Sequence, residues 1–174
     1  NDNIQILHSE KYRVKLAQGL DDNAILDDSA IERGLKALSD LAPLTEKLTP
    51  DNFKVVATYT LRRAKNAQTF LNAAAKVFPF DIEVISGHEE ARLIYQGVAH
   101  HLPPSSQRLV IDIGGGSTEC VIGKNLTTKQ LTSLNIGCVS FANKYFSTGE
   151  ISSQAFNQAI LESKQEIESH VKRF

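Results

Sequence analysis

The sequence predicts an α/β fold in which a mixed sheet is flanked by helices. Short apolar runs rich in β-branched residues, which are typical of strands, alternate with longer segments whose apolar residues recur every three to four positions, as in amphipathic helices. Helices and strands that alternate along the chain are the mark of α/β proteins. The chain has 174 residues, enough for one large domain or two small ones.

The first hundred residues are expected to form strands and helices in alternation. In chain order, we expect two strands, then a helix, a strand, a helix, a strand and a helix, at Ile4–Leu16, Ser29–Leu48, Phe53–Thr58, Leu61–Val77, Ile82–Ile85 and Glu89–Ala99. Asp27 or Asp28 is the expected N-cap of the first helix, because its carboxylate can accept a hydrogen bond from an unpaired backbone N–H.

The Pro- and Ser-rich segment 100–107 is the best candidate for a linker. Beyond it, two apolar runs flank three glycines, so Arg108–Gly123 is predicted to form a β-hairpin with a glycine turn. A further strand is expected at Lys129–Leu134, followed by helices at Val139–Phe146 and Ser153–Val171.

The composition excludes several classes of protein. With 41% apolar and 22% charged residues and a net charge of −1, the chain shows no sign of general nucleic-acid or anionic-membrane binding. An anion would therefore have to bind at a local site. The sequence has no apolar run long enough to span a membrane and no signal peptide, so we expect a soluble cytoplasmic protein. Cys120 and Cys138 are expected to be small core residues.

The glycine turn is the strongest candidate for a binding site. Asp112 ends the first strand of the hairpin, and Gly114, Gly115 and Gly116 are followed by Ser117. Glycines permit a positive φ and a close approach of a ligand to the backbone, and successive N–H groups there can bind an anion. The neighbouring carboxylate suits Mg²⁺, which binds one or two carboxylates together with phosphate oxygens. The alternative is a glycine hairpin without a ligand, and the spacing matches neither a P-loop nor a dinucleotide-binding motif.

Two strand-to-helix junctions are weaker candidates. At the first, Arg62 follows a strand and could clamp phosphate at the start of a helix. At the second, Glu89 or Glu90 could activate a water as general base, with Arg92 to orient it. The residues alone favour the simpler alternatives, which are surface arginines and carboxylates that stabilise a helix start. The segment Asn135–Ser140 is interpreted as a structural entry into a helix.

Four segments together resemble the exopolyphosphatase and guanosine pentaphosphate phosphohydrolase family. They are, in order, ATYTLRRAKNA, ISGHEEARLIYQGV, VIDIGGGSTECVIG and NIGCVSFANKYF, and the resemblance covers nearly the whole chain. Four motifs in order are far more specific than any one of them. The resemblance implies a fold of the actin-like, sugar-kinase-like ATPase superfamily, with two ribonuclease-H-like domains and an active cleft between them.

The resemblance also implies a domain organisation. Residues 1–104 would be the first ribonuclease-H-like domain, without the N-terminal strand and phosphate loop that open the sequences of the family. Residues 105–174 would be the opening part of the second domain. We therefore expect a piece of a longer protein, truncated at both ends, that is weakly active or inactive by itself. The full-length protein is expected to form a homodimer, as is common in the family.

The family's functional positions can be carried over residue by residue. Glu90 matches the catalytic general base, which would activate water for in-line attack on a terminal phosphoryl group. Asp112 and Glu119 match the acidic positions linked to the divalent cation, here expected to be Mg²⁺. The resemblance assigns phosphate binding to six residues, Arg62, Gly114, Gly115, Gly116, Ser117 and Thr118.

The expected function is Mg²⁺-dependent release of terminal phosphate from inorganic polyphosphate. Guanosine pentaphosphate is the alternative substrate, and the sequence gives no physical basis for choosing between the two. A nucleotide-binding switch of the actin-like superfamily and a non-catalytic sensor of polyphosphate or guanosine pentaphosphate are alternatives from other functional classes. No nucleic-acid partner and no membrane-spanning segment are expected.

Overall fold

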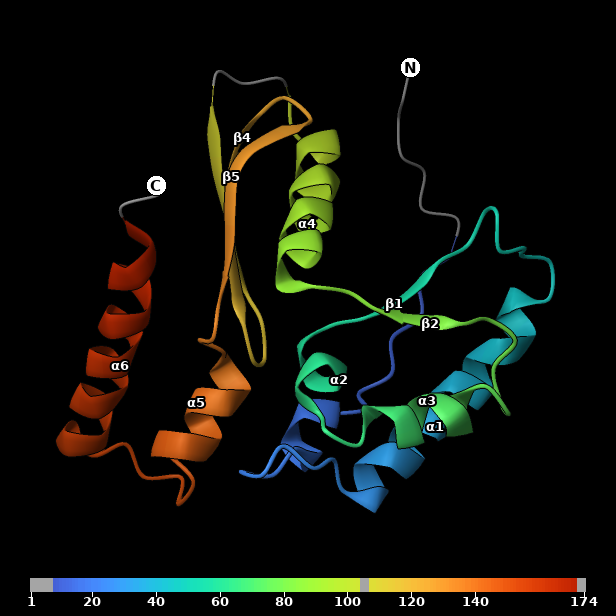
Figure 1. Cartoon of the computed structure of the whole chain (residues 1–174), viewed down its shortest axis with the longest axis horizontal. Coiled ribbons are helices and arrows are strands. Elements are labelled where there is room, and N and C mark those ends of the chain that lie inside the picture. Colours follow the sequence, from blue (N-terminus) through green and yellow to red (C-terminus); the bar gives the residue numbers. More distant parts are fainter. Residues whose placement is uncertain (1–7, 104–106, 172–174) are drawn as a thin grey trace. The chain divides into compact units, whose positions relative to one another are not determined.

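Helices and strands alternate along the chain as the sequence predicts (Figure 1). The computed structural model describes residues 8–103 and 107–171. Contacts between Cα atoms divide it into two compact units. We call Ser9–Ile85 the early unit and the described residues from Ser86 onward the late unit. None of the helices in the described part of the chain combines the length and the apolar character needed to span a bilayer.

The early unit packs its helices around a short parallel sheet. Its elements, in chain order, are η1 (Leu16–Gly19), α1 (Asp28–Leu41), η2 (Ala42–Thr45), β1 (Val55–Ala57), α2 (Tyr59–Arg63), α3 (Ala67–Ala74) and β2 (Ile82–Val84). Strands β1 and β2 pair in parallel, so their carboxyl ends lie at one edge of the sheet. The buried core of this unit includes Leu26, Leu61 and Phe70.

Helix α1 is shorter than its apolar stripe predicts. Asp27 is the N-cap, as expected, and its Oδ1 accepts a hydrogen bond of 2.6 Å from the N–H of Ala30. The predicted continuation to Leu48 is wrong, because α1 ends at Leu41 and passes into η2, which has Pro43 at its start. Proline has no N–H to continue the α-helical hydrogen-bond ladder.

The single helix predicted over Leu61–Val77 is also wrong, because a tertiary contact divides it into α2 and α3. The side chain of Asn66 accepts a hydrogen bond from the N–H of Leu26 and donates one to the carbonyl of the same residue, both at 2.9 Å. The N–H of Lys65 donates to the carbonyl of Ala24 at 2.8 Å. These bonds fix an extended turn between the two helices, which the periodicity of the apolar residues does not reveal.

The strands predicted over Ile4–Leu16 have a mixed outcome. The part at Ile4 and Ile6 lies outside the described residues. Within the described residues 8–15 there is no strand, so the expected strand at Tyr12–Leu16 is wrong. A strand needs a neighbour to pair its N–H and C=O groups, and β1 and β2 pair only with each other in the described part of the chain.

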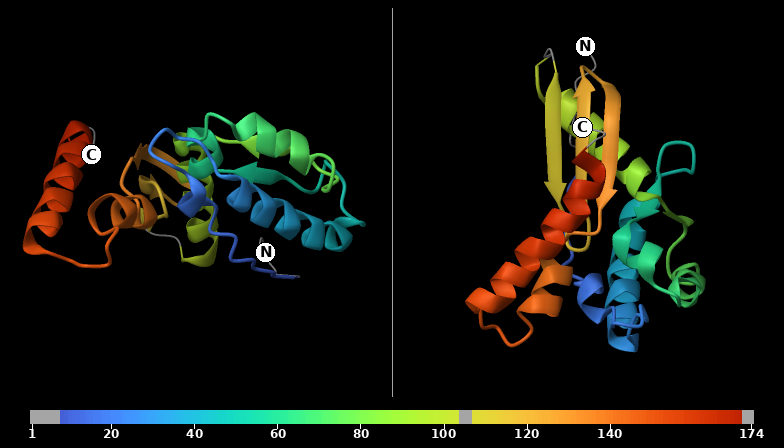
Figure 2. Two further views of the ribbon diagram at one scale, coloured as in Figure 1. Left: turned by 90° about the horizontal axis from the view of Figure 1, so that it is seen from below. Right: turned by 60° about the vertical axis from the view of Figure 1, so that its left-hand side comes forward.

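The late unit contains the predicted glycine hairpin. Its elements, in chain order, are α4 (Gly87–His101), β3 (Arg108–Ile113), β4 (Thr118–Lys124), β5 (Thr127–Leu134), α5 (Cys138–Tyr145) and α6 (Ser153–Val171). The three strands form an antiparallel sheet in the order β3–β4–β5, seen face-on in the right-hand view of Figure 2. The predicted hairpin over Arg108–Gly123 is confirmed, with Asp112 paired to Glu119.

Helix α4 covers one face of this sheet. Its buried residues Ala91, Tyr95 and Ala99 pack against Val110 of β3 and Val121 of β4. Figure 1 shows that α4 begins at the end of the sheet that carries the turn between β3 and β4. The opposite face of the sheet meets α6 around a small cavity of about 160 Å³.

The border between the two units differs from the predicted domain border. The sequence predicts a domain border near residue 104, and the contacts divide this chain into two units between Ile85 and Ser86. The reason is that α4, expected at the end of the first domain, shares a core with β3 and β4. The assignment of residues 1–104 and 105–174 to two ribonuclease-H-like domains remains a prediction.

Candidate active site

The turn between β3 and β4, residues 114–117, is hereafter the glycine loop. It is closed by a hydrogen bond of 2.9 Å from the N–H of Gly114 to the carbonyl of Ser117. None of its three glycines has a positive φ, so a left-handed backbone is not the reason for glycine at these positions. The expected close approach of a ligand to the backbone remains a prediction. A Cβ on Gly114 would lie 2.9 Å from the carbonyl oxygen of Ser117, and one on Gly115 would lie 3.4 Å from Val139. The close approach of the Ser117 carbonyl oxygen explains glycine at position 114.

Three consecutive N–H groups of the glycine loop lack a protein acceptor. Within the described part of the chain, the N–H groups of Gly115, Gly116 and Ser117 make no hydrogen bond. The Ser117 hydroxyl also has no hydrogen-bond partner among the described residues, although Ser117 is only 3% exposed. Buried polar groups in proteins are normally paired. A set of adjacent unpaired donors is therefore suited to binding an anion such as phosphate.

The N-terminal end of helix α5 is hydrogen-bonded to the glycine loop. Its first N–H groups donate to loop carbonyls, from Cys138 to Gly114 at 3.0 Å and from Val139 to Gly115 at 2.8 Å. The Thr118 hydroxyl donates to the carbonyl of Ile136 at 2.6 Å. A hydroxyl has one hydrogen to donate, so in this arrangement Thr118 supports the loop, and its expected contact with phosphate remains a prediction.

Two carboxylates lie beside the loop. Asp112 and Glu119 are directly opposite each other on β3 and β4, and therefore point to the same face of the sheet, the face covered by α4. Asp112 is exposed, whereas Glu119 is 1% exposed. The Glu119 Oε1 accepts a hydrogen bond of 2.7 Å from the hydroxyl of Ser133 on β5, its one hydrogen-bond partner among the described residues.

This pair of carboxylates fits a divalent cation. Opposed like charges destabilise a sheet, and a buried carboxylate with a single hydrogen bond is costly unless a cation compensates it. The described residues contain no group of three or more acidic, His or Cys side chains that could hold a metal. Two carboxylates with phosphate oxygens are nevertheless a ligand set that Mg²⁺ accepts.

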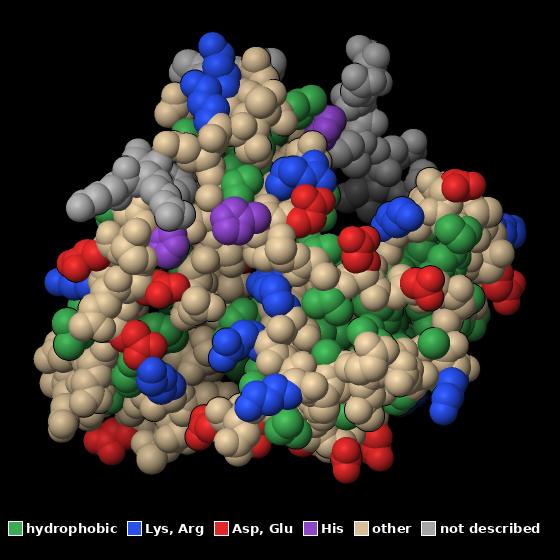
Figure 3. Space-filling model, viewed as in Figure 1, with side chains coloured by type: hydrophobic (Ala, Val, Ile, Leu, Met, Phe, Trp, Pro, Cys, Tyr) green, Lys and Arg blue, Asp and Glu red, His purple; other side chains and the backbone are tan. Residues whose placement is uncertain are grey.

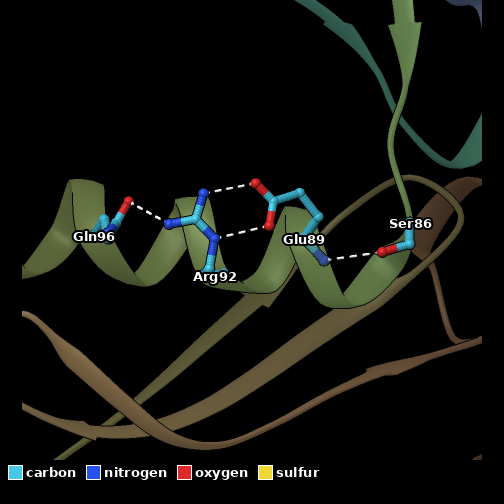
Figure 4. Close-up of polar contacts among 4 residues, drawn as sticks. All are labelled: Ser86, Glu89, Arg92 and Gln96. Atoms are coloured by element: carbon cyan, nitrogen blue, oxygen red, sulfur yellow. Dashed lines mark hydrogen bonds and ion pairs between the residues drawn. The ribbon is translucent and has the colours of Figure 1, made fainter.

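The start of α4 carries two neighbouring glutamates, Glu89 and Glu90. The Ser86 hydroxyl caps the helix by accepting a hydrogen bond of 3.1 Å from the N–H of Glu89. Both carboxylate oxygens of Glu89 accept hydrogen bonds from Arg92, at 2.6 and 2.7 Å, and Arg92 also donates to Gln96 at 2.9 Å (Figure 4). Arg92 therefore orients Glu89. Glu90 is half-buried beside it, in the first turn of α4.

The ion pair predicts a measurable pH dependence. The hydrogen bond from Arg92 lowers the pKa of Glu89 below its ordinary value of 4.5. A lowered pKa in the folded state means that the contribution to stability is present above the ordinary value and is lost as the pH falls through the lowered one. We expect Arg92→Gln to return the pKa of Glu89 towards 4.5, as measured by NMR titration of its carboxyl carbon. An unchanged pKa would show that another group holds this carboxylate.

Glu90, Asp112, Glu119 and the glycine loop all belong to the late unit. Ala91 follows Glu90 and packs in the same core as Val110 and Val121, on the sheet face to which the two carboxylates also point. The structure therefore brings the expected general base, the expected cation ligands and the expected phosphate loop to the same end of one sheet (Figure 1).

Arg62 lies in the early unit, at the end of α2. Its Nη1 donates to the carbonyl of Ile85 at 2.9 Å. Ile85 follows β2, so Arg62 is placed at the carboxyl edge of the parallel sheet, where α/β proteins bind ligands. Its expected role at phosphate remains a prediction.

A groove of about 420 Å³ in the early unit does not share these features. It runs beside β1 and is lined mainly by apolar residues, including Leu38, Val55 and Phe70. Figure 3 shows hydrophobic side chains gathered on the surface where Figure 1 places β1 and β2. An apolar lining does not suit a polyanion, so the polar residues of the late unit are the better candidates for a phosphate site.

Two residues that support the site, Ser133 and Gly137, could not be predicted from the sequence. Ser133 contacts Glu119 only because β5 pairs with β4 in a particular register. Gly137, in the turn between β5 and α5, packs against Gly115 and Gly116 of the glycine loop. The glycine in NIGCVS is the one sequence signal for this contact, and the sequence by itself favours a simple helix entry.

Comparison with known proteins gives the chain a family. Residues 1–174 match the Ppx/GppA phosphatase family. A protein of Haemophilus influenzae named as an exopolyphosphatase is 50% identical over 159 residues, which cover 91% of this chain and 49% of that protein. A guanosine-5'-triphosphate,3'-diphosphate pyrophosphatase of Pseudoalteromonas atlantica is 43% identical, over 98% of this chain and 34% of that protein. The chain thus spans half or less of the length of these relatives.

Solved structures agree with the sequence comparison. The crystal structure of an exopolyphosphatase-like protein superposes with a TM-score of 0.81 at 27% identity, over 90% of this chain and 50% of that one. The Aquifex aeolicus PPX-GPPA enzyme gives a TM-score of 0.69 at 29% identity, over 90% of this chain and 52% of that one. The predicted fold class is confirmed, and the chain belongs to the Ppx/GppA phosphatase family.

Proposed function

We propose that the full-length protein releases the terminal phosphate of inorganic polyphosphate by Mg²⁺-dependent hydrolysis. The observation that carries the proposal is the glycine loop, where the N–H groups of Gly115, Gly116 and Ser117 have no acceptor in the described part of the chain. Membership of the Ppx/GppA phosphatase family supports the same chemistry.

The proposed mechanism needs little covalent work by the protein. Phosphoryl transfer depends mainly on positioning and on stabilising the charge of the phosphoryl oxygens. The N–H groups of the glycine loop would bind those oxygens. The resemblance to the family adds Arg62 as a further phosphate-binding residue, through its guanidinium. Glu90 would take a proton from the attacking water. Asp112 and Glu119 would hold Mg²⁺, which when bound supplies positive charge next to the phosphate.

Guanosine pentaphosphate is the second candidate substrate. The relative from Pseudoalteromonas atlantica, at 43% identity, carries a name for the cleavage of this nucleotide. The relative from Haemophilus influenzae, at 50% identity, is named as an exopolyphosphatase, which favours polyphosphate. A homodimer and a cytoplasmic location are further proposals for the full-length protein.

Phosphate release from both substrates tests the proposed function. We expect the full-length protein to release phosphate from long-chain polyphosphate with Mg²⁺ and to lose this activity with a chelator. Release from guanosine pentaphosphate alone would move the protein to the second candidate. Binding of either substrate without release would favour the non-catalytic switch or sensor. We expect the 174-residue chain by itself to be much slower than the full-length protein.

A further inference from the structure

We propose that Gly137 and the first turn of α5 position the glycine loop for phosphate binding. This inference rests on the proposed function and adds a positioning residue outside the expected site. The segment involved, Ile136–Ser140, is hereafter the α5 clamp.

The N–H groups of the α5 clamp donate hydrogen bonds to carbonyls of the glycine loop. Cys138 donates to the carbonyl of Gly114 at 3.0 Å, and Val139 and Ser140 both donate to the carbonyl of Gly115, at 2.8 and 3.0 Å. The first N–H groups of a helix have no partner within the helix, and in many proteins they bind an anion directly. Here they bind the backbone of the glycine loop instead.

These bonds also set the direction of the loop N–H groups. The carbonyl of Gly114 and the N–H of Gly115 belong to one peptide group, and the carbonyl of Gly115 and the N–H of Gly116 belong to the next. A trans peptide is planar, so its C=O and N–H point in opposite directions. By holding the two carbonyls, α5 directs both N–H groups away from itself, and hydrogen bonds in series strengthen one another. These N–H groups are two of the three that lack an acceptor in the described part of the chain.

Gly137 makes this arrangement possible because it has no side chain. Its φ of −144° and ψ of 151° are open to any residue, so conformation does not require glycine here. A Cβ on Gly137, however, would lie 2.3 Å from the Cα of Gly116 and 2.4 Å from the carbonyl oxygen of Gly115. Both are backbone atoms, so any side chain at this position would displace the loop.

The α5 clamp is fixed on its other side as well. The N–H and the side-chain amide of Asn135 donate to Glu166 of α6, at 2.9 and 3.1 Å. The hydroxyl of Thr118 holds the carbonyl of Ile136 at 2.6 Å. Because the chain is held at two residues just before Gly137, a substitution at Gly137 is expected to move the glycine loop rather than the clamp.

The experiment is a titration of the ¹⁵N-glycine-labelled full-length protein with inorganic phosphate, followed by NMR. In the wild type we expect the amide signals of Gly115 and Gly116 to shift as phosphate binds. In Gly137→Ala we expect binding about tenfold weaker, the scale of one lost hydrogen bond to a charged group. Gly97→Ala is the matched control, because a Cβ on Gly97 meets nothing within 4 Å.

A second variant acts on the clamp from a different position. Cys138→Pro removes the N–H that donates to Gly114 at 3.0 Å and puts the proline Cδ in its place, so the carbonyl of Gly114 has to turn away. Proline itself is favoured at the first position of a helix. The backbone angles of Gly137 also suit a residue before proline. We expect several-fold weaker phosphate binding than in Cys138→Ala, which keeps the N–H. If Gly137→Ala does not fold, this variant tests the positioning role of the α5 clamp.

The outcomes separate this inference from the proposed function. Wild-type affinity and wild-type shifts in both Gly137→Ala and Cys138→Pro would overturn the positioning role and leave the phosphate site intact. An absence of any shift at Gly115 and Gly116 in the wild type would overturn the proposed phosphate loop, and the inference with it.

Discussion

Replacing Glu90 by glutamine is expected to lower the kcat of the full-length protein on polyphosphate by roughly 10²–10⁴-fold, the usual contribution of a general base. The amide has nearly the size of the carboxylate but cannot accept a proton from water. Glu90 sits in the first turn of α4, at the end of the sheet that carries the glycine loop (Figure 1). Because the change spares the phosphate-binding groups, we expect KM to change little.

Glu89→Gln is the matched control for this prediction. Glu89 has the same chemistry and lies one residue away, but both of its oxygens are bound by Arg92. We expect its kcat to stay within a few-fold of the wild type. Equal losses in the two variants would show that the start of α4 needs its negative charge and would argue against a general base at Glu90.

Replacing Tyr95 by alanine is expected to lower the free energy of unfolding by about 3–5 kcal/mol, as for other buried aromatic residues. Tyr95 has an exposed fraction of 0%, and its hydroxyl donates to the carbonyl of Asn125 at 3.0 Å. Its ring fills the space beside Gly123, where a Cβ would lie 2.3 Å from the ring carbon Cζ. This residue attaches α4 to β4, so its loss would also disturb the position of Glu90.

Denaturant unfolding of the full-length protein, followed by circular dichroism, measures this effect. Tyr95→Phe is the control, because it keeps the ring and removes only the hydrogen bond to Asn125, which is worth about 1 kcal/mol. If Tyr95→Ala were as stable as Tyr95→Phe, the ring would not be the main contact between α4 and the sheet.

The fold class follows from local pattern, whereas the helix boundaries depend on tertiary contacts. The hairpin around the glycines could be predicted because both strands and the turn are continuous in the sequence. The division between α2 and α3 could not, because it depends on Asn66 bonding to Leu26, forty residues earlier. The same holds for α4, which lies before the expected linker but packs against the sheet that follows it.

The residues of the candidate site could likewise be predicted from the sequence only in part. Glu90, Asp112 and Glu119 could be named from motifs, because those motifs lie in strand and helix ends that the pattern locates. The supports of these residues could not be named, because Ser133 depends on strand register and Gly137 on a close approach of two loops. The resemblance to a family supplied the roles, and the physical pattern by itself favoured simpler interpretations for Arg62 and Glu90.

The most direct test of the central claim is the origin of the oxygen in the released phosphate. The full-length protein would be given long-chain polyphosphate in H₂¹⁸O with Mg²⁺, and the first phosphate released would be analysed by mass spectrometry. In-line attack by water on the terminal phosphoryl group predicts one ¹⁸O in each phosphate and release that requires Glu90. Phosphate without ¹⁸O, or release by Glu90→Gln at the rate of the wild type, would contradict the account.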